Sequence, residues 1–179
     1  MTKAERLSVA THEASHYVAL MRLLPDIKIK SIEIFGEPVD GFLGWVKYDA
    51  SELSTTDPVN HARMVINDFA GVAGEKRLGL LSDVHLSAHA RGDYDVAGDA
   101  CRDWGLDGVK LMRSAETLVA EEWDVIEALA TVLMERGKLT GKEAARICET
   151  AKSKTKQRTK NVDANHQRNR IKRVRRSHV

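Results

Sequence analysis

The sequence has few of the residues that build disulfide-rich, strand-rich or membrane-spanning folds. Its 179 residues include only two cysteines, Cys101 and Cys148, which form no Cys-x-x-Cys pair and are expected to be free thiols in a reducing cytoplasm. Aromatic residues make up 5% and there are three prolines, a composition that favours helices over a β-sandwich. No apolar run approaches the ~18 residues that span a bilayer, and the amino terminus lacks the apolar core of a secretory leader. We therefore expect a cytoplasmic location and no membrane segment.

Charge divides the chain into two parts. Hydrophobic residues make up 42% and charged residues 30% of the sequence, which is ordinary for a globular domain. The net charge is +2, but residues 152–179 alone carry +10, which leaves −8 on residues 1–151. We predict one domain at residues 1–151, followed by a basic tail at residues 152–179 whose polar composition favours disorder.

Apolar spacing in the first part of the chain predicts a helix followed by a strand pair. The helix should run from about Thr2 to Leu24, because Pro25 disfavours helix at the residue before it. Residues 27–48 then alternate apolar and polar side chains in two short runs, with glycines and a proline between them. We expect two antiparallel strands here, with a third strand not required.

The rest of the chain up to residue 151 has the pattern of helices. Asp57 and Pro58 are typical of a helix start, and Gly79 of its end. Residues 80–92 have an irregular pattern, and further helices are predicted at residues 93–104, within 109–136, and from the capping-box sequence at Thr140–Glu143 to about residue 151. The predicted fold class is therefore mainly α with a small antiparallel β element (α+β).

The most informative motif is His12-Glu13-Ala14-Ser15-His16 in the first predicted helix. Residues four apart lie on one helix face, so both imidazoles can bind one metal ion, and Glu13 lies beside them to take a proton from a metal-bound water. Shuffling this composition produces the motif in about one chain in fifty. The apolar positions 10, 14 and 18 should face the core, which leaves the motif facing a cleft.

A catalytic zinc site has three protein ligands and one open position, and periodicity alone does not select the third ligand. The acidic cluster of residues 93–99 offers Asp93, Asp95 and Asp99. His85 and His89 also have metal-ligand spacing, but this pair arises in roughly a quarter of shuffled sequences and no glutamate lies between them. We interpret them as loop or surface residues.

Several motifs, in order, resemble the zinc peptidase domain of the FtsH family of AAA proteases. The family's His-Glu-Ala-Gly-His helix corresponds to residues 12–16, and its Leu-Gly strand to Leu43-Gly44. Its Ala-Gly-Arg-Ala-Ala-Glu helix corresponds to residues 70–75, and its Gly-x-x-x-Asp-Leu segment with the small-residue helix that follows corresponds to residues 91–100. The resemblance extends over residues 5–150 and implies a helical zincin domain.

This resemblance implies a zinc site formed by His12, His16 and Asp95, with Glu75 orienting a zinc-binding imidazole. The glycine-to-aspartate spacing is one residue shorter than in the family, which keeps Asp93 as the second choice. Two further departures are Ser15, where the family has glycine, and Gly74, where it has alanine. The chain contains no ATP-binding Gly-x-x-x-x-Gly-Lys-Ser/Thr motif, so an ATPase or adaptor would have to act in trans.

The leading hypothesis is a zinc-dependent metalloendopeptidase that cleaves flexible polypeptide segments, with Glu13 as the general base. The strand around Trp45 could bind such a segment along its edge. The alternative is a non-enzymatic, peptidase-like regulator whose basic tail binds nucleic acid or an acidic protein. A third hypothesis, a peptidase that cleaves one regulatory target while the tail localises it, is not separated from the first by the sequence.

Overall fold

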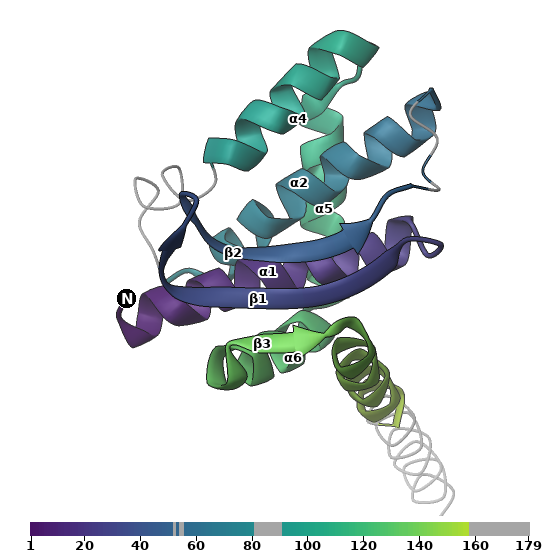
Figure 1. The fold of residues 1–179 in the computed structure, drawn as a ribbon. Helices are drawn as coiled ribbons and strands as arrows, with labels where there is room; N and C mark the ends of the chain where they lie inside the picture. The colour runs from purple at the N-terminus through teal and green to yellow at the C-terminus, as the bar shows by residue number, and fades with distance from the viewer. Residues whose placement is uncertain (52, 54–55, 81–90, 158–179) are drawn as a thin grey trace, which may run out of the picture.

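The chain is built around one central helix, α1 (Lys3–Leu23), in a computed structural model that describes residues 1–51, 53, 56–80 and 91–157. Thr2 caps α1, since its hydroxyl accepts from the backbone N–H of Glu5 while the Glu5 carboxylate accepts from the backbone of Thr2. The helix ends at Leu23, before Pro25, as the sequence predicts. Strands lie on one side of it and helices on the others (Figure 1).

A three-stranded antiparallel sheet packs against α1. It consists of β1 (Lys28–Val39), β2 (Phe42–Asp49) and β3 (Lys138–Thr140), in the order β2-β1-β3. The turn between β1 and β2 is only Asp40-Gly41, both with positive φ, which is the backbone of a tight hairpin. The strands therefore extend further than their alternation predicted. Because β2 pairs only with β1 in the described sheet, its other side is an edge.

Helix α2 (Pro58–Leu78) crosses α1 on the side away from β3 (Figure 1). Asp57 caps its start, and Gly79 ends it with φ 68°, so both predicted boundaries are confirmed. Helices α4 (Arg91–Trp104) and α5 (Gly108–Glu121) pack on α2 around a small apolar cluster, whose buried members are Val65, Phe69, Ala97 and Ala115. This cluster holds the first turn of α4 near α1.

The long helical pattern of residues 109–136 is divided in the structure. Helix α5 ends at Glu121 and α6 (Trp123–Arg136) begins after Glu122, although no glycine or proline marks the break. Glu122 pairs with Arg22 at 2.9 Å and with Lys152 at 3.6 Å. Tertiary ion pairs thus accompany a bend that the local sequence does not signal.

The last described helix occupies residues 141–157. The predicted capping box at its start is confirmed: Glu143 Oε2 accepts from the Thr140 backbone at 2.9 Å, and Thr140 Oγ1 accepts from the Glu143 backbone at 3.3 Å. The helix continues past Ala151, so the predicted boundary between domain and tail falls inside it. Residues 158–179, which carry most of the basic tail, lie outside the described residues.

The described fold is therefore predominantly helical with a small antiparallel sheet, as the sequence predicted. None of the described helices is both long enough and apolar enough to cross a membrane.

Candidate metal centre

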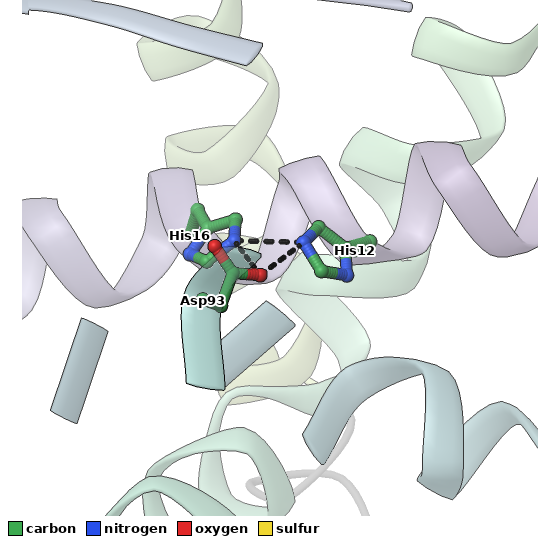
Figure 2. A group of neighbouring side chains, drawn as sticks. All are labelled: His12, His16 and Asp93. Atoms are coloured by element: carbon green, nitrogen blue, oxygen red, sulfur yellow. Dashed lines mark hydrogen bonds and ion pairs between the residues drawn. The ribbon is translucent and has the colours of Figure 1, made fainter. Parts of the chain in front are cut away.

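Three electron-pair donors meet where α1 faces the start of α4 (Figure 2). His12 Nε2 and His16 Nε2 lie 2.9 Å apart. Asp93 Oδ2 lies 2.9 Å from His12 Nε2 and 3.5 Å from His16 Nε2. Four-residue spacing on a helix brings the two imidazoles together, and the apolar cluster under α4 brings in the carboxylate. These three residues form a group with the geometry to hold one metal ion.

The structure places Asp93, rather than the predicted Asp95, beside the two imidazoles. The side chain of Asp95 is 74% exposed and pairs with Arg91 at 4.0 Å, away from the imidazoles. Helix α4 contains both Asp93 and Asp95, and two residues along a helix rotate a side chain by about 200°. Asp93 therefore faces α1 while Asp95 faces outward.

The remaining alternatives do not compete with Asp93 in the described structure. Asp99 is an exposed residue that pairs with Arg102. His85 and His89 lie outside the described residues.

The second nitrogen of each imidazole faces an acceptor. His16 Nδ1 lies 2.8 Å from the backbone carbonyl of Asn67, so this nitrogen carries the proton and donates. His12 Nδ1 lies 3.8 Å from Glu75 Oε2, and Ser8 Oγ donates to the other oxygen of Glu75 at 3.2 Å. The His16 contact places the proton on Nδ1 and leaves the lone pair of a neutral imidazole on Nε2, pointing at the shared space. His12 Nδ1 faces Glu75 but is too far away for a hydrogen bond; in the same tautomer, His12 would also present its Nε2 lone pair to this space. Glu75, which the family resemblance assigns to orienting an imidazole, thus lies near His12.

A glycine of α2 keeps the space beside the two imidazoles open. A β-carbon on Gly71 would lie 2.5 Å from His16 Nε2 and 2.6 Å from His12 Nε2, closer than any ordinary contact. Two lone pairs and a carboxylate directed into such a space repel one another unless a cation or a proton lies between them. Tetrahedral ligands at about 2.0–2.1 Å from zinc lie roughly 3.3 Å apart, close to the distances observed here. The residues present therefore fit a zinc ion.

Electrostatics at this centre favour positive charge. Burial lowers the pKa of His12, but the carboxylates of Asp93 and Glu75 outweigh it and raise this pKa well above its ordinary value. The pKa of His16 is also raised, because Asp93 and Glu13 outweigh burial and the charge of His12. Burial raises the pKa of Asp93, yet the two imidazoles lower it further, so the net shift is downward. The Asp93 carboxylate therefore stays ionised, and its charge favours a cation, either a proton or a metal ion, at the two imidazoles.

Glu13 lies between the metal ligands and the edge strand. A β-carbon on Gly44 of β2 would come within 2.8 Å of Glu13 Oε1, so the glycine leaves room for the carboxyl group. Burial raises the pKa of Glu13 against the opposing charges of His12 and His16, which makes the carboxylate a stronger base than an exposed glutamate.

These groups line a cleft of about 650 Å³ between β2, α1, α2 and the start of α4. The motif residues form its floor, with His12 and His16 each 9% exposed and Glu13 6%. The sequence predicted α1 to be anchored on one face only, but residues 8–20 are all buried. Because α1 is the central helix, the face that carries the His12–His16 motif is covered too, and the cleft gives access to it.

Sequence reasoning did not identify two further cleft residues on α2, Asn67 and Asp68. Asp68 is half-buried, and burial raises its pKa to about 6. Neither belongs to a motif, so only the packing of α2 against α1 shows that they border the site. The apolar spacing of α2 indicates only that Asp68 does not lie on the apolar face of that helix.

Comparison with family models and with curated proteins found no match to this chain.

Proposed function

We propose that this protein is a zinc-dependent metalloendopeptidase that hydrolyses peptide bonds in flexible polypeptide segments. One observation carries the proposal: three metal-ligand atoms from His12, His16 and Asp93 converge at the floor of a cleft, beside the buried carboxyl group of Glu13. Three protein ligands with a remaining open position are characteristic of catalytic zinc, whereas structural zinc sites have four.

Each residue of the centre has a distinct task in this mechanism. Zinc, when bound, supplies Lewis acidity that polarises the scissile carbonyl and makes water more acidic. Glu13 accepts a proton from the attacking water and then donates it to the nitrogen of the leaving amine. Glu75 and the Asn67 carbonyl orient the two imidazoles through their Nδ1 atoms.

The edge of β2 supports a route for the substrate. An extended peptide can add to an exposed strand edge through backbone hydrogen bonds, and β2 residues, Trp45 among them, line the cleft together with Glu13. Such binding requires an unfolded segment, because a folded chain has already paired its backbone. A flexible region, or one delivered by an ATPase or adaptor in trans, would satisfy this requirement.

Glu13 also favours an enzyme over a peptidase-like regulator that acts only through its basic tail. A structural zinc site needs no base, and burying a carboxyl group without a task costs stability. We further propose that the domain is of the FtsH peptidase type, since the helix, hairpin, helix and acidic helix occur in the order that the motifs indicate.

The decisive experiment combines zinc analysis with cleavage of an unstructured protein such as casein. Wild-type protein should hold about one zinc per chain and cleave casein, with cleavage blocked by a chelator. Glu13→Gln should retain the zinc and lose about 10²–10⁴-fold in rate, because an amide cannot accept the proton of water. Zinc-loaded wild type that cleaves no faster than Glu13→Gln would reject the proposal.

A further inference from the structure

The cleft has an acidic end that the proposed chemistry does not use. Along α1 the cleft runs from Val9 past the histidines to Leu20, which at 1.5 Å per residue is about 16 Å. This length matches roughly five residues of an extended chain. Asn67 contacts His16, so Asn67 and Asp68 mark the end of the cleft nearer Leu20.

Asp68 has no lysine or arginine partner among the described residues that line the cleft. Arg91 is the one Lys or Arg residue among the described residues that line the cleft, and it pairs with Asp95. The Asn67 side chain donates a hydrogen bond to the Asp68 carboxylate. The charge of His16 acts on Asp68, but no lysine or arginine that lines the described part of the cleft pairs with this carboxylate.

Asn67 supplies an independent sign that a donor is missing. Its side chain is 6% exposed and lines the cleft, yet its Oδ1 has no hydrogen-bond donor among the described residues. Buried polar atoms are almost always hydrogen-bonded. Asn67 and Asp68, neighbours on α2, therefore bring an oxygen without a donor and a carboxylate to the same end of the cleft.

An aromatic ring borders the same end. Tyr48 lines the cleft from β2, and it lies close enough to Asp68 for that carboxylate's charge, after burial, to raise the pKa of the Tyr48 hydroxyl. Tyr48 follows Gly44 by four strand residues, or about 13 Å, which separates it from the Glu13 end. An aromatic face beside a carboxylate is a good environment for a cation.

We propose that Asp68, with Asn67 and Tyr48, forms a subsite for a basic side chain of the substrate, so that the enzyme prefers a lysine or arginine near the scissile bond. An ammonium or guanidinium group carries several N–H donors, and it would satisfy both acceptors at once. The opposite end of the cleft, around Pro38, Phe42 and Leu43, presents mainly apolar side chains. The two ends therefore differ in the substrate side chains they suit. This inference rests on the proposed function, because it assigns the substrate class of the same site.

The test uses unstructured, neutral peptides in which one lysine is scanned through each position around the cleavage site. The matched control replaces that lysine with norleucine, which keeps the alkyl chain and removes the charge. Binding is measured by fluorescence anisotropy with the zinc-loaded Glu13→Gln variant, which does not depend on turnover. Cleavage is measured as kcat/KM with wild-type enzyme.

At one scanned position, the peptide with lysine should bind about tenfold more tightly than the peptide with norleucine, equivalent to about 1.4 kcal/mol. The peptide with glutamate at that position should bind more weakly than the norleucine peptide. Adding Asp68→Asn should bring the lysine-to-norleucine ratio close to one. Adding Asp95→Asn, at another carboxylate that lines the cleft, should leave the ratio unchanged. Zinc content and thermal unfolding of each variant confirm that the site and fold are intact.

Equal binding of lysine, norleucine and glutamate peptides at every position would overturn the inference, as would a preference that survives Asp68→Asn. These outcomes are distinct from failure of the proposed function. Cleavage without a lysine preference retains the peptidase and rejects the subsite. A lysine preference in binding without any cleavage retains the subsite and rejects the peptidase.

Discussion

Ser15 of α1 lies directly against Gly74 of α2, where the two helices cross. A β-carbon on Gly74 would lie 2.1 Å from Ser15 Oγ and 3.0 Å from Ser15 Cβ, while Ser15 Oγ donates to the Thr11 carbonyl at 2.8 Å. In the sequence these residues are two separate departures from the FtsH pattern, serine for glycine and glycine for alanine. In the structure the two positions share one space, because the Ser15 side chain occupies the crossing and Gly74 leaves room for it.

We predict that Gly74→Ala and Ser15→Gly are strongly coupled. Alone, Gly74→Ala should lower the free energy of unfolding by about 1–3 kcal/mol through overpacking, despite the better helix propensity of alanine. Adding Ser15→Gly should restore most of that loss, because the two positions share one space. Urea unfolding of the four proteins of the double-mutant cycle measures the coupling. Additive effects would mean that the helices separate freely at this crossing.

Gly71→Ala should remove the metal site without removing the fold. The new methyl group would displace the imidazoles of His12 and His16, and we expect zinc affinity to fall at least about tenfold. Gly98→Ala on α4 is the matched control, since its β-carbon would meet only Arg102 Nη1, at 4.0 Å. Competition with a chromophoric chelator measures both affinities. Unchanged affinity in Gly71→Ala would show that α2 does not enclose the site as described.

The zinc affinities of Asp93→Ala and Asp95→Ala should show which of the two aspartates binds the metal. Loss of groups that only orient a metal ligand costs 10–100-fold in affinity, so loss of a direct ligand should cost about 100-fold or more. We expect this loss for Asp93→Ala, while Asp95→Ala should stay within about threefold of wild type. Calorimetric zinc titration measures both, and the reverse order would restore the family-based assignment of Asp95.

The stability of the protein should depend on pH in opposite directions with and without zinc. The pKa values of His12 and His16 are raised on folding. Without metal, their contribution to stability is therefore complete below the unfolded value of about 6.5 and is lost as pH rises through the folded values. Zinc instead requires the neutral imidazoles, so its affinity rises with pH.

The gap in Tm between zinc-loaded and chelator-treated protein should accordingly widen from pH 6 to pH 8. Differential scanning calorimetry at the two pH values measures the gap. His12→Gln, which cannot titrate in this range, should remove most of the pH dependence of the chelated protein. A gap that narrows with rising pH would contradict the assignment of these imidazoles as metal ligands.

Truncation should locate the end of the folded domain after Gln157 rather than after Ala151. Thr155 Oγ1 donates to Asp124 Oδ2 at 2.9 Å, and Lys152 pairs with Glu122 at 3.6 Å. A chain ending at Ala151 loses both contacts and should be less stable by about 1–2 kcal/mol. A chain ending at Gln157 should match the full-length protein in thermal unfolding and zinc content. Equal stability of the two truncated chains would make residues 152–157 dispensable.

Local signals in the sequence were sufficient for most element boundaries. Pro25 ends the first helix, Asp57 and Gly79 bound the second, and the Thr140–Glu143 capping box opens the last, because each acts on backbone groups within a few residues of itself. The two strands followed from alternation, and the turn between them lies at Asp40-Gly41, within the glycine-containing segment that separates the two runs. The break at Glu122 has no such signal, and it was not predicted.

The sequence by itself determined the chemistry of the centre: two imidazoles and a glutamate on one helix, since four-residue spacing places them on the same face in any α-helix. Only the tertiary structure decided that Asp93, and not Asp95, completes the group. That choice depends on which face of α4 packs on α2, because each residue along a helix turns a side chain by about 100°. The burial of α1, the fit of Ser15 against Gly74 and the acidic end of the cleft at Asp68 likewise depend on how separate elements pack, which no local pattern encodes.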